Sequence, residues 1–266
     1  MTPIKGTLSA IKFVFFTLFL FPSLFLFASS LGASVTYSVH LGPHGYAPYF
    51  IVDKSEKGNV YSGIAHDLLD YFEQQNPGYK RTHLILPRKR VNTMMARGPV
   101  LDVMLNSQLF VTSDVLKHYQ FTIPLFRSRD VVITRRDQAF EYSSPSDLHG
   151  KSVGTIIGYG YGEFDRLFSQ GSVDDVRVDS HEQAIGMLVN KRTDAYLGNR
   201  FVSPYYMKRM GLNPTDFLLS EIPIYEFDLA FLVNKRKPEL LEKLNQFIDQ
   251  VIADGTRDRI IKQHLN

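Results

Sequence analysis

After residue 34, the apolar positions of the chain change repeatedly between a spacing typical of strands and a spacing typical of helices. The first pair is a strand over residues 35–41 and a helix over residues 64–75, which Asn76, Pro77 and Gly78 terminate. Further strands are predicted over residues 83–86, 101–105, 151–157, 176–178 and 194–197, and further helices over residues 88–97, 163–168, 181–190 and 238–254. Strands that alternate with helices predict an α/β fold with mainly parallel sheets.

Residues 1–34 have a different pattern. Lys5 and Lys12 precede an apolar run over residues 13–28, and small residues follow that run. This order predicts a cleaved secretory signal peptide. Pro22 interrupts a run of about 16 residues, which is shorter than the roughly 20 that a spanning helix needs. We therefore expect export, with cleavage near Ser34 and a freely diffusing protein in the periplasm.

Charge and composition narrow the range of functions. The chain has 266 residues, 44% hydrophobic and 21% charged, which is ordinary for a globular protein, and about 230 residues remain after export, enough for two lobes. Its 30 basic and 27 acidic residues give +3, and removal of Lys5 and Lys12 leaves +1. A surface so near neutrality does not favour nucleic-acid binding. The absence of cysteine excludes disulfides, thiolate nucleophiles and cysteine zinc sites.

A series of short motifs runs along the mature chain. The first is Tyr46-Ala47-Pro48-Tyr49, followed by Asp53 and Gly63-Ile64-Ala65-His66-Asp67-Leu68. Later motifs are Pro87 with Arg90, Thr112 before Phe121-Thr122-Ile123-Pro124, residues 147–154, Thr193-Asp194-Ala195 and Asp254-Gly255. No single motif is specific, but the ordered set spans nearly the whole mature chain. In this set the chain resembles the bacterial extracellular solute-binding proteins, family 3, of the polar amino-acid type, as a divergent member.

The resemblance implies a fold. It is the type II periplasmic-binding-protein clamshell, in which each of two lobes is a mainly parallel sheet flanked by helices. Two hinge crossings are then expected near residues 129–136 and 222–233, which are strand-like stretches on either side of the second set of strands and helices. The lobes predicted are a discontinuous lobe 1, residues 35–132 plus 229–266, and a lobe 2, residues 133–228.

The resemblance also implies a site, and this chain departs from it. The family's carboxylate-binding arginine falls at Val115, which cannot form the bidentate fork. Its ammonium-binding aspartate falls at Asn199, which keeps hydrogen bonds but loses the charge. Tyr159 and Gly160 replace a usual hydroxyl pair. Ordinary α-amino acids are therefore expected to bind poorly.

Other polar and aromatic residues are candidates for the ligand contacts. Tyr46 and Tyr49 match an aromatic wall, with packing in the core as the alternative interpretation. Arg90 is the preferred anion-binding residue and Arg200 the weaker one, although Arg90 also fits a solvated basic run. The turn of residues 158–162 either offers backbone N–H groups to an anion or is a plain flexible turn. The full candidate ligand-binding set is Tyr46, Tyr49, Arg90, Asn106, Ser107, Tyr159, Gly160, Tyr161, Asn199 and Arg200.

Enzymatic and metal-binding alternatives have less support. The Gly-x-Ser-x-Gly elbow is absent, and Gly42-Pro43 prevents His40 and His44 from sharing a helix face as metal ligands. No cofactor is expected. Periplasmic cyclohexadienyl-type dehydratases resemble this family, and such a reaction needs an acid in the cleft. Glu163, Glu221 and Glu226 are the candidate acids.

The sequence thus predicts a periplasmic solute-binding protein and no enzyme. It captures a small polar or aromatic ligand between two lobes and delivers it to an inner-membrane permease of the ABC type. A dehydratase and a stand-alone ligand sensor are the alternatives. We expect a monomer, a small-molecule ligand and no nucleic-acid partner.

Overall fold

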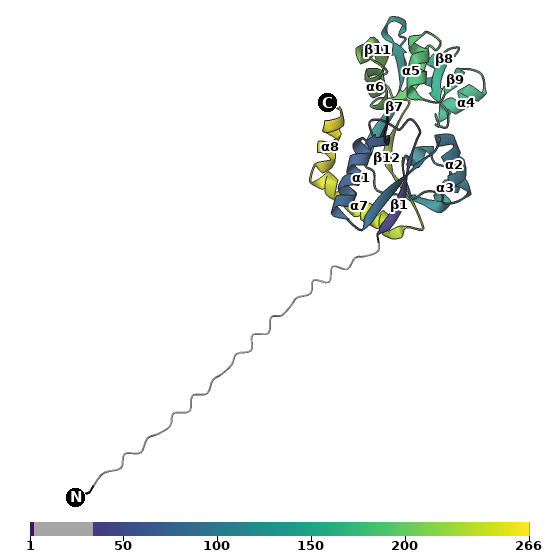
Figure 1. Cartoon of the computed structure of the whole chain (residues 1–266). Helices are drawn as coiled ribbons and strands as arrows, with labels where there is room; N and C mark the ends of the chain where they lie inside the picture. The colour runs from purple at the N-terminus through teal and green to yellow at the C-terminus, as the bar shows by residue number, and fades with distance from the viewer. Residues whose placement is uncertain (3–33, 266) are drawn as a thin grey trace. The chain divides into compact units, whose positions relative to one another are not determined.

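The chain is described by a computed structural model that covers residues 1–2 and 34–265 (Figure 1). The predicted signal peptide, apart from its two ends, lies outside the described residues. Among the helices of the described part, none is both long enough and apolar enough to cross a membrane.

The first sheet carries the parallel strands that open the mature chain. Its order is β4-β1-β5-β12, with β1 pairing in parallel with β4 and β5. The bounds are β1 Val35–Leu41, β4 Tyr79–Ile85, β5 Val103–Asn106 and β12 Tyr225–Asn234. A further short strand, β6 Tyr119–Phe121, pairs with β12. Its helices are α1 Ile64–Gln75, α2 Arg88–Arg97 and α3 Ser113–His118, and a hairpin of β2 Ile51–Ser55 and β3 Gly58–Ser62 precedes α1.

The second sheet repeats this arrangement further along the chain. Its strands are β8 Ser152–Ile156, β9 Asp174–Val178 and β10 Ala195–Asn199. A further short strand, β11 Phe217–Leu219, pairs with β7 Phe126–Arg135. β8 pairs in parallel with both β9 and β10. Its helices are α4 Glu163–Ser169, α5 His181–Val189 and α6 Val202–Arg209. The fold is therefore the two-lobed α/β architecture expected from the sequence.

Two long strands join the sheets. β7 Phe126–Arg135 and β12 Tyr225–Asn234 pair with each other through residues 126–130 and 225–229. From Ala230 onward, β12 pairs instead with β5 of the first sheet, whereas β7 pairs with β10 of the second. Both strands overlap the stretches where the sequence predicts the crossings. The lobe boundaries 35–132 plus 229–266 and 133–228 remain our proposal.

The C-terminal helices return to the first lobe. α7 Pro238–Ala253 and α8 Thr256–Leu265 pack with α1, and the His264 ring is 2.7 Å from Asp67 on α1. Figure 1 shows the yellow C-terminal helices beside blue α1, while the green elements form the other lobe. The apolar stripe of α7 explains this return, because Leu240, Leu244, Phe247, Ile248 and Val251 are all buried.

Most elements match the sequence pattern closely. The bounds of α1 and α2 are those predicted, and the Ser180 side chain caps α5 by accepting a hydrogen bond from the backbone N–H of Gln183. β4 begins earlier than predicted, at Tyr79, because its pairing with β1 extends the strand across polar residues. The β2–β3 hairpin, α3, α6 and α8 carry weaker periodicity and are not predicted by the pattern.

Candidate functional site

Two adjoining cavities lie where the two sheets face each other. The wide cavity has a volume of about 320 Å³, and the narrow cavity has about 40 Å³. Both are lined by Tyr46, Arg88, Leu105, Ile156, Tyr159 and His181. The narrow cavity also reaches the hinge strands at Asp130 and Phe227. Both lobes therefore contribute to one continuous site.

The structure brings together half of the candidate residues. Those that line a cavity are Tyr46, Asn106, Tyr159, Gly160 and Asn199. Those that line neither cavity are Tyr49, Arg90, Ser107, Tyr161 and Arg200. In each case the local structure explains why a residue of the second group lines neither cavity.

Aromatic rings form one wall of the site. The Tyr46 and Tyr159 rings meet edge to face at 6.4 Å between centroids, one from each lobe, and the His181 ring lies 6.3 Å from Tyr46. Tyr49 is one layer behind, because it is buried and stacks on the far side of Tyr46 at 5.4 Å. Tyr49 therefore packs behind the aromatic wall and does not face these two cavities. This is the alternative interpretation, packing in the core.

Arg88 supplies a positive charge to both cavities. It is the first residue of α2, and one of its terminal nitrogens donates to Oδ1 of Asn106 at 2.7 Å. Its guanidinium carbon lies 5.6 Å from the Tyr159 ring centroid, a cation–π contact between the lobes. Burial lowers its pKa, but arginine remains charged. No acidic side chain of the described residues forms an ion pair with Arg88, and its Nε is buried without a partner.

The preference for Arg90 needs correction. The Arg90 side chain is exposed and lies outside both cavities. Both residues belong to α2, where two positions along the helix turn the side-chain direction by about 200°. Arg88 therefore points into the site and Arg90 points away. At Arg90 the basic run is a solvated helix face, which is the alternative interpretation of the sequence.

A carboxylate enters the narrow cavity from hinge strand β7. Asp130 is buried, is the direct cross-strand partner of Asn199, and accepts a hydrogen bond from Nδ2 of Asn199 at 2.8 Å. The same Nδ2 lies 2.8 Å from Oγ of Ser128. Burial raises the pKa of Asp130 to about 6, and the Asn199 amide and Tyr225 phenol oppose that rise. The described residues offer Asp130 no cationic partner within ion-pair distance.

The remaining candidate side chains are held by local structure. Oδ1 of Asn199 accepts from the N–H groups of Phe201 and Val202 at the start of α6. Ser107 accepts from the N–H of Leu109 and caps a short 3-10 helix. Arg200 donates to the carbonyl of Ser220 at 3.0 Å, outside the cavities.

The glycine turn, for which the sequence leaves an anion site and a plain turn open, contributes Tyr159 and Gly160 to the cavities. The N–H of Tyr161 already donates to Oδ2 of Asp165 at 2.9 Å, so a carboxylate of α4 occupies this region. The Tyr161 hydroxyl accepts from the N–H of Ile156 and is buried in the second lobe. Only Gly160 and Tyr159 of this turn reach the cavities, beside Ile157 before it.

The position of the family's arginine is apolar in this chain. Val115 is buried on α3 in a cluster with Val91, Met95, Leu101 and Tyr119, and it lines neither cavity. No charge is available there for a carboxylate, which agrees with the sequence analysis.

The three acids considered for a dehydratase do not reach the site. Glu163, Glu221 and Glu226 are exposed, and Glu226 pairs with Arg127 at 2.8 Å. Asp130 is the acidic side chain that lines the narrow cavity. It follows that these glutamates offer no acid catalysis on a molecule bound in the cavities.

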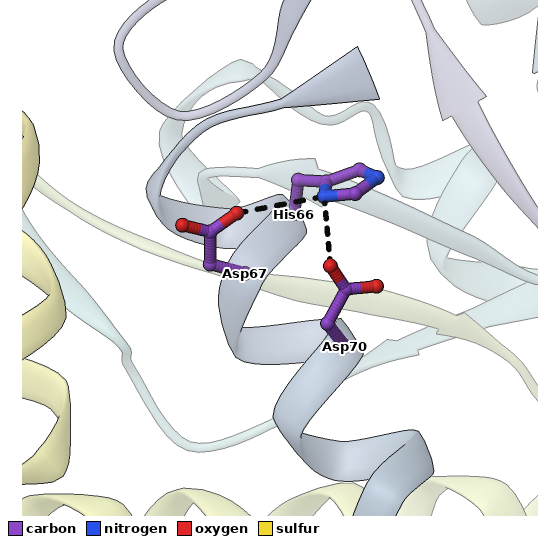
Figure 2. A group of neighbouring side chains, drawn as sticks. All are labelled: His66, Asp67 and Asp70. Carbon is purple, nitrogen blue, oxygen red and sulfur yellow. Dashed lines mark ion pairs between the residues drawn. The ribbon is translucent and has the colours of Figure 1, made fainter. Parts of the chain in front are cut away.

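Figure 2 shows a separate cluster on α1, in which Nδ1 of His66 lies 3.6 Å from Asp67 and 3.3 Å from Asp70. These three residues have the ligand types of a metal centre. Arg81, however, forms an ion pair with Asp70 and lies 3.1 Å from the other His66 ring nitrogen. His264 pairs with Asp67. The cluster is thus already compensated by positive charge, and it joins α1 to β4 and α8.

His181 is a buried polar side chain at the boundary between the lobes. Its Nδ1 lies 2.5 Å from the Tyr196 hydroxyl, and its ring stacks on Tyr206 at 4.9 Å. Its Nε2 has no hydrogen-bond partner among the described residues. Burial, with a smaller effect of His44, lowers the pKa of His181 to about 3. The imidazole is therefore neutral at physiological pH.

This pKa predicts acid sensitivity. In the unfolded chain His181 takes up a proton near pH 6.5, whereas in the folded protein it does so only near pH 3, so the free energy of unfolding falls as pH falls through this window. We expect His181→Gln to flatten the dependence between pH 6 and 4 by about 1.4 kcal/mol per pH unit. Urea denaturation followed by circular dichroism measures this, with exposed His149→Gln as control. Parallel profiles for wild type and His181→Gln would contradict the assignment.

The comparisons with known proteins agree with this geometry. The family model for bacterial extracellular solute-binding proteins, family 3, matches residues 40–266. The chain belongs to this family. That assignment confirms the resemblance noted in the sequence.

Relatives of this family 3 chain show how far it has diverged. It is 24% identical over 165 residues to a probable amino-acid-binding protein, YxeM, of Bacillus subtilis, and 28% identical over 158 residues to the ABC transporter arginine-binding protein 1 of Escherichia coli. These matches cover 61% and 59% of this chain, and 61% and 63% of the relatives' own lengths. A solved structure of a mutant arginine-binding protein from T. maritima superposes with a TM-score of 0.70 at 21% identity, covering 86% of this chain and 94% of that one. At this identity the likeness shows the fold.

Arg88, Asp130 and His181 line the site of this family member and are absent from the sequence-based set. Arg88 had a usable signal, because it directly follows Pro87 at the end of a strand, where α2 begins. Asp130 also had a usable sequence signal, because it is an acid beside the apolar run Val131-Val132-Ile133. The role of His181 depends on contacts across the lobes and has no local signal.

Proposed function

We propose that this chain is an exported receptor that captures a small polar or aromatic solute with an anionic group. The observation that carries the proposal is a half-buried arginine, Arg88, whose Nε is buried and which has no acidic partner among the described residues, in a cavity built by both lobes. A buried charge without a counterion is costly, and a ligand anion would remove that cost. Arg88 Nε has no hydrogen-bond partner among the described residues, and a ligand carboxylate would supply one.

The arrangement of the lobes supports capture by closure. Tyr46 and Arg88 belong to the first lobe and Tyr159 and His181 to the second, so a ligand gains the full set of contacts only when the lobes are together. A ligand that binds the closed form better shifts the equilibrium toward it. The hinge strands β7 and β12 carry the connection.

The biological setting is part of the same proposal. We place the mature chain in the periplasm after cleavage near Ser34, as a monomer without a nucleic-acid partner. An inner-membrane permease of the ABC type would receive the closed form, and a stand-alone sensor is the alternative use of the same switch. N-terminal sequencing of the exported protein tests the cleavage site; retention of residues 13–28 would contradict it.

A thermal-shift screen tests the capture of solutes. Small carboxylates with apolar or aromatic bodies are expected to stabilise the protein, since a ligand at about 100 times its dissociation constant adds roughly 2.7 kcal/mol. Glycine, alanine and other common α-amino acids are expected to bind in the millimolar range or not at all, because Val115 and Asn199 lack the family's charges. Micromolar binding of these amino acids in calorimetry would contradict the proposal, as would a screen in which no small anion stabilises the chain.

A further inference from the structure

The site contains a second charge that the proposed anion contact leaves unused. The Asp130 carboxylate lines the narrow cavity, is buried, and has no cationic partner among the described residues. It faces inward together with Ser128, because alternate residues of a strand share one face. A half-buried Arg88 and a buried Asp130, each without a counterion among the described residues, thus line the same narrow cavity.

The two charges are separated within that cavity. No ion pair joins Arg88 to Asp130, although both lie on its wall. Burial raises the pKa values of Tyr46 and Tyr159, and in each case Asp130 adds to the rise while Arg88 opposes it. Along hinge strand β12, the partner of Asp130 is Tyr225, whereas Asn106, which accepts the hydrogen bond of Arg88, pairs with Ala230. Five residues of a strand span roughly 16 Å, so the two charges approach the cavity from separate positions along β12, and the Tyr46 and Tyr159 rings line it with them.

We propose that the ligand is dipolar, with an anionic group at Arg88 and a positively charged nitrogen at Asp130, joined by a spacer that passes Tyr46 and Tyr159. This inference rests on the proposed function and adds the second pole of the ligand. The class of compound is an extended amino carboxylate, in which the amine is several carbons from the carboxylate.

The shape of the narrow cavity agrees with this class. Its volume of about 40 Å³ has room for on the order of three water-sized groups, enough for an ammonium with one or two methylenes. The nitrogen would meet Asp130, whose position Asn199 fixes through its hydrogen bond. An α-ammonium would lie beside Arg88 instead, in the wide cavity, where the acidic lining residue Asp179 is exposed to solvent and forms no ion pair with Arg88.

Calorimetry with a homologous series tests the second pole. The probes are glycine, 4-aminobutanoate, 5-aminopentanoate and 6-aminohexanoate, with pentanoate and hexanoate as amine-free partners. We expect a long amino carboxylate to bind at least tenfold tighter than its amine-free partner, and glycine not to bind. L-lysine differs from 6-aminohexanoate only by its α-amino group, and we expect it to bind more weakly.

Substitution of Asp130 localises the effect. Asp130→Asn keeps an oxygen for the Asn199 hydrogen bond, and it should abolish the advantage of the amine, so that 6-aminohexanoate binds this variant no tighter than hexanoate does. Asp174→Asn, an exposed acid of the second lobe, should keep the advantage. If plain carboxylates bind wild type as tightly as amino carboxylates do, this inference is overturned while the proposed function stands. The same holds if amino carboxylates still bind Asp130→Asn more tightly than their amine-free partners do. Failure of every carboxylate to bind would overturn the proposed function together with it.

Discussion

Replacing Arg88 with methionine is expected to weaken binding of an anionic solute by at least about 30-fold, because truncation of one partner of a desolvated charged contact costs roughly 2 to 5 kcal/mol. The same change should leave the melting temperature of the free protein unchanged or raise it. Arg88 has no acidic partner to lose, and methionine fills a similar volume without a buried charge. Calorimetry and thermal denaturation measure the two effects.

Arg90→Met is the matched control for this prediction. It lies on the same helix, two positions further on, and its side chain is exposed. We expect its affinity to stay within about twofold of wild type, since exposed side chains outside a site change little. Loss of affinity in Arg90→Met, or a large fall in melting temperature in Arg88→Met, would show that Arg88 has a structural role instead.

A methyl group at Gly158 is expected to hold the lobes apart. Gly158 has φ +86°, and a Cβ built there lies 2.8 Å from the backbone nitrogen of Lys89 on α2 of the other lobe. The Lys89 backbone cannot yield as a side-chain tip can, so Gly158→Ala should weaken ligand binding at least about tenfold, or 1.4 kcal/mol. Equilibrium dialysis with the best ligand from the screen gives the affinity.

Gly171→Ala separates this steric effect from backbone strain. Gly171 also lies in the second lobe with φ +69°, but nothing is within 4 Å of its Cβ position. Both variants should lose about 1 kcal/mol or more of stability from a left-handed residue. Only Gly158→Ala should also lose affinity. Equal affinities in the two variants would mean that the contact at Lys89 does not belong to the ligand-binding form.

The sequence predicted the elements whose cause is local. The apolar stripe of α7, the cap at Ser180 and the stop after Gln75 depend on neighbouring residues, and the structure places them as expected. The β2–β3 hairpin depends on its packing before α1, and α8 on contacts with α1 and α7, so their own residues gave weak signals. The family resemblance supplied the two-lobed fold, which periodicity alone does not determine.

The site was harder to predict for a physical reason. Whether Arg88 or Arg90 faces the cavity depends on the residue at which α2 begins, and a shift of one or two positions turns the helix face away. Asp130 was overlooked because an acid was sought on β10, where the sequence has Asn199, whereas the carboxylate lies across the strand pair on β7. Tyr49 and Tyr161 have the residue type of a ligand wall, yet burial assigns them to the core.

A crystal structure of the mature protein with the tightest-binding carboxylate tests the central claim most directly. The account predicts one ligand enclosed between the lobes, with its carboxylate in a bidentate contact with Arg88 and its body against Tyr46 and Tyr159. A ligand bound outside the two cavities, or inside them with its carboxylate away from Arg88, would contradict the account.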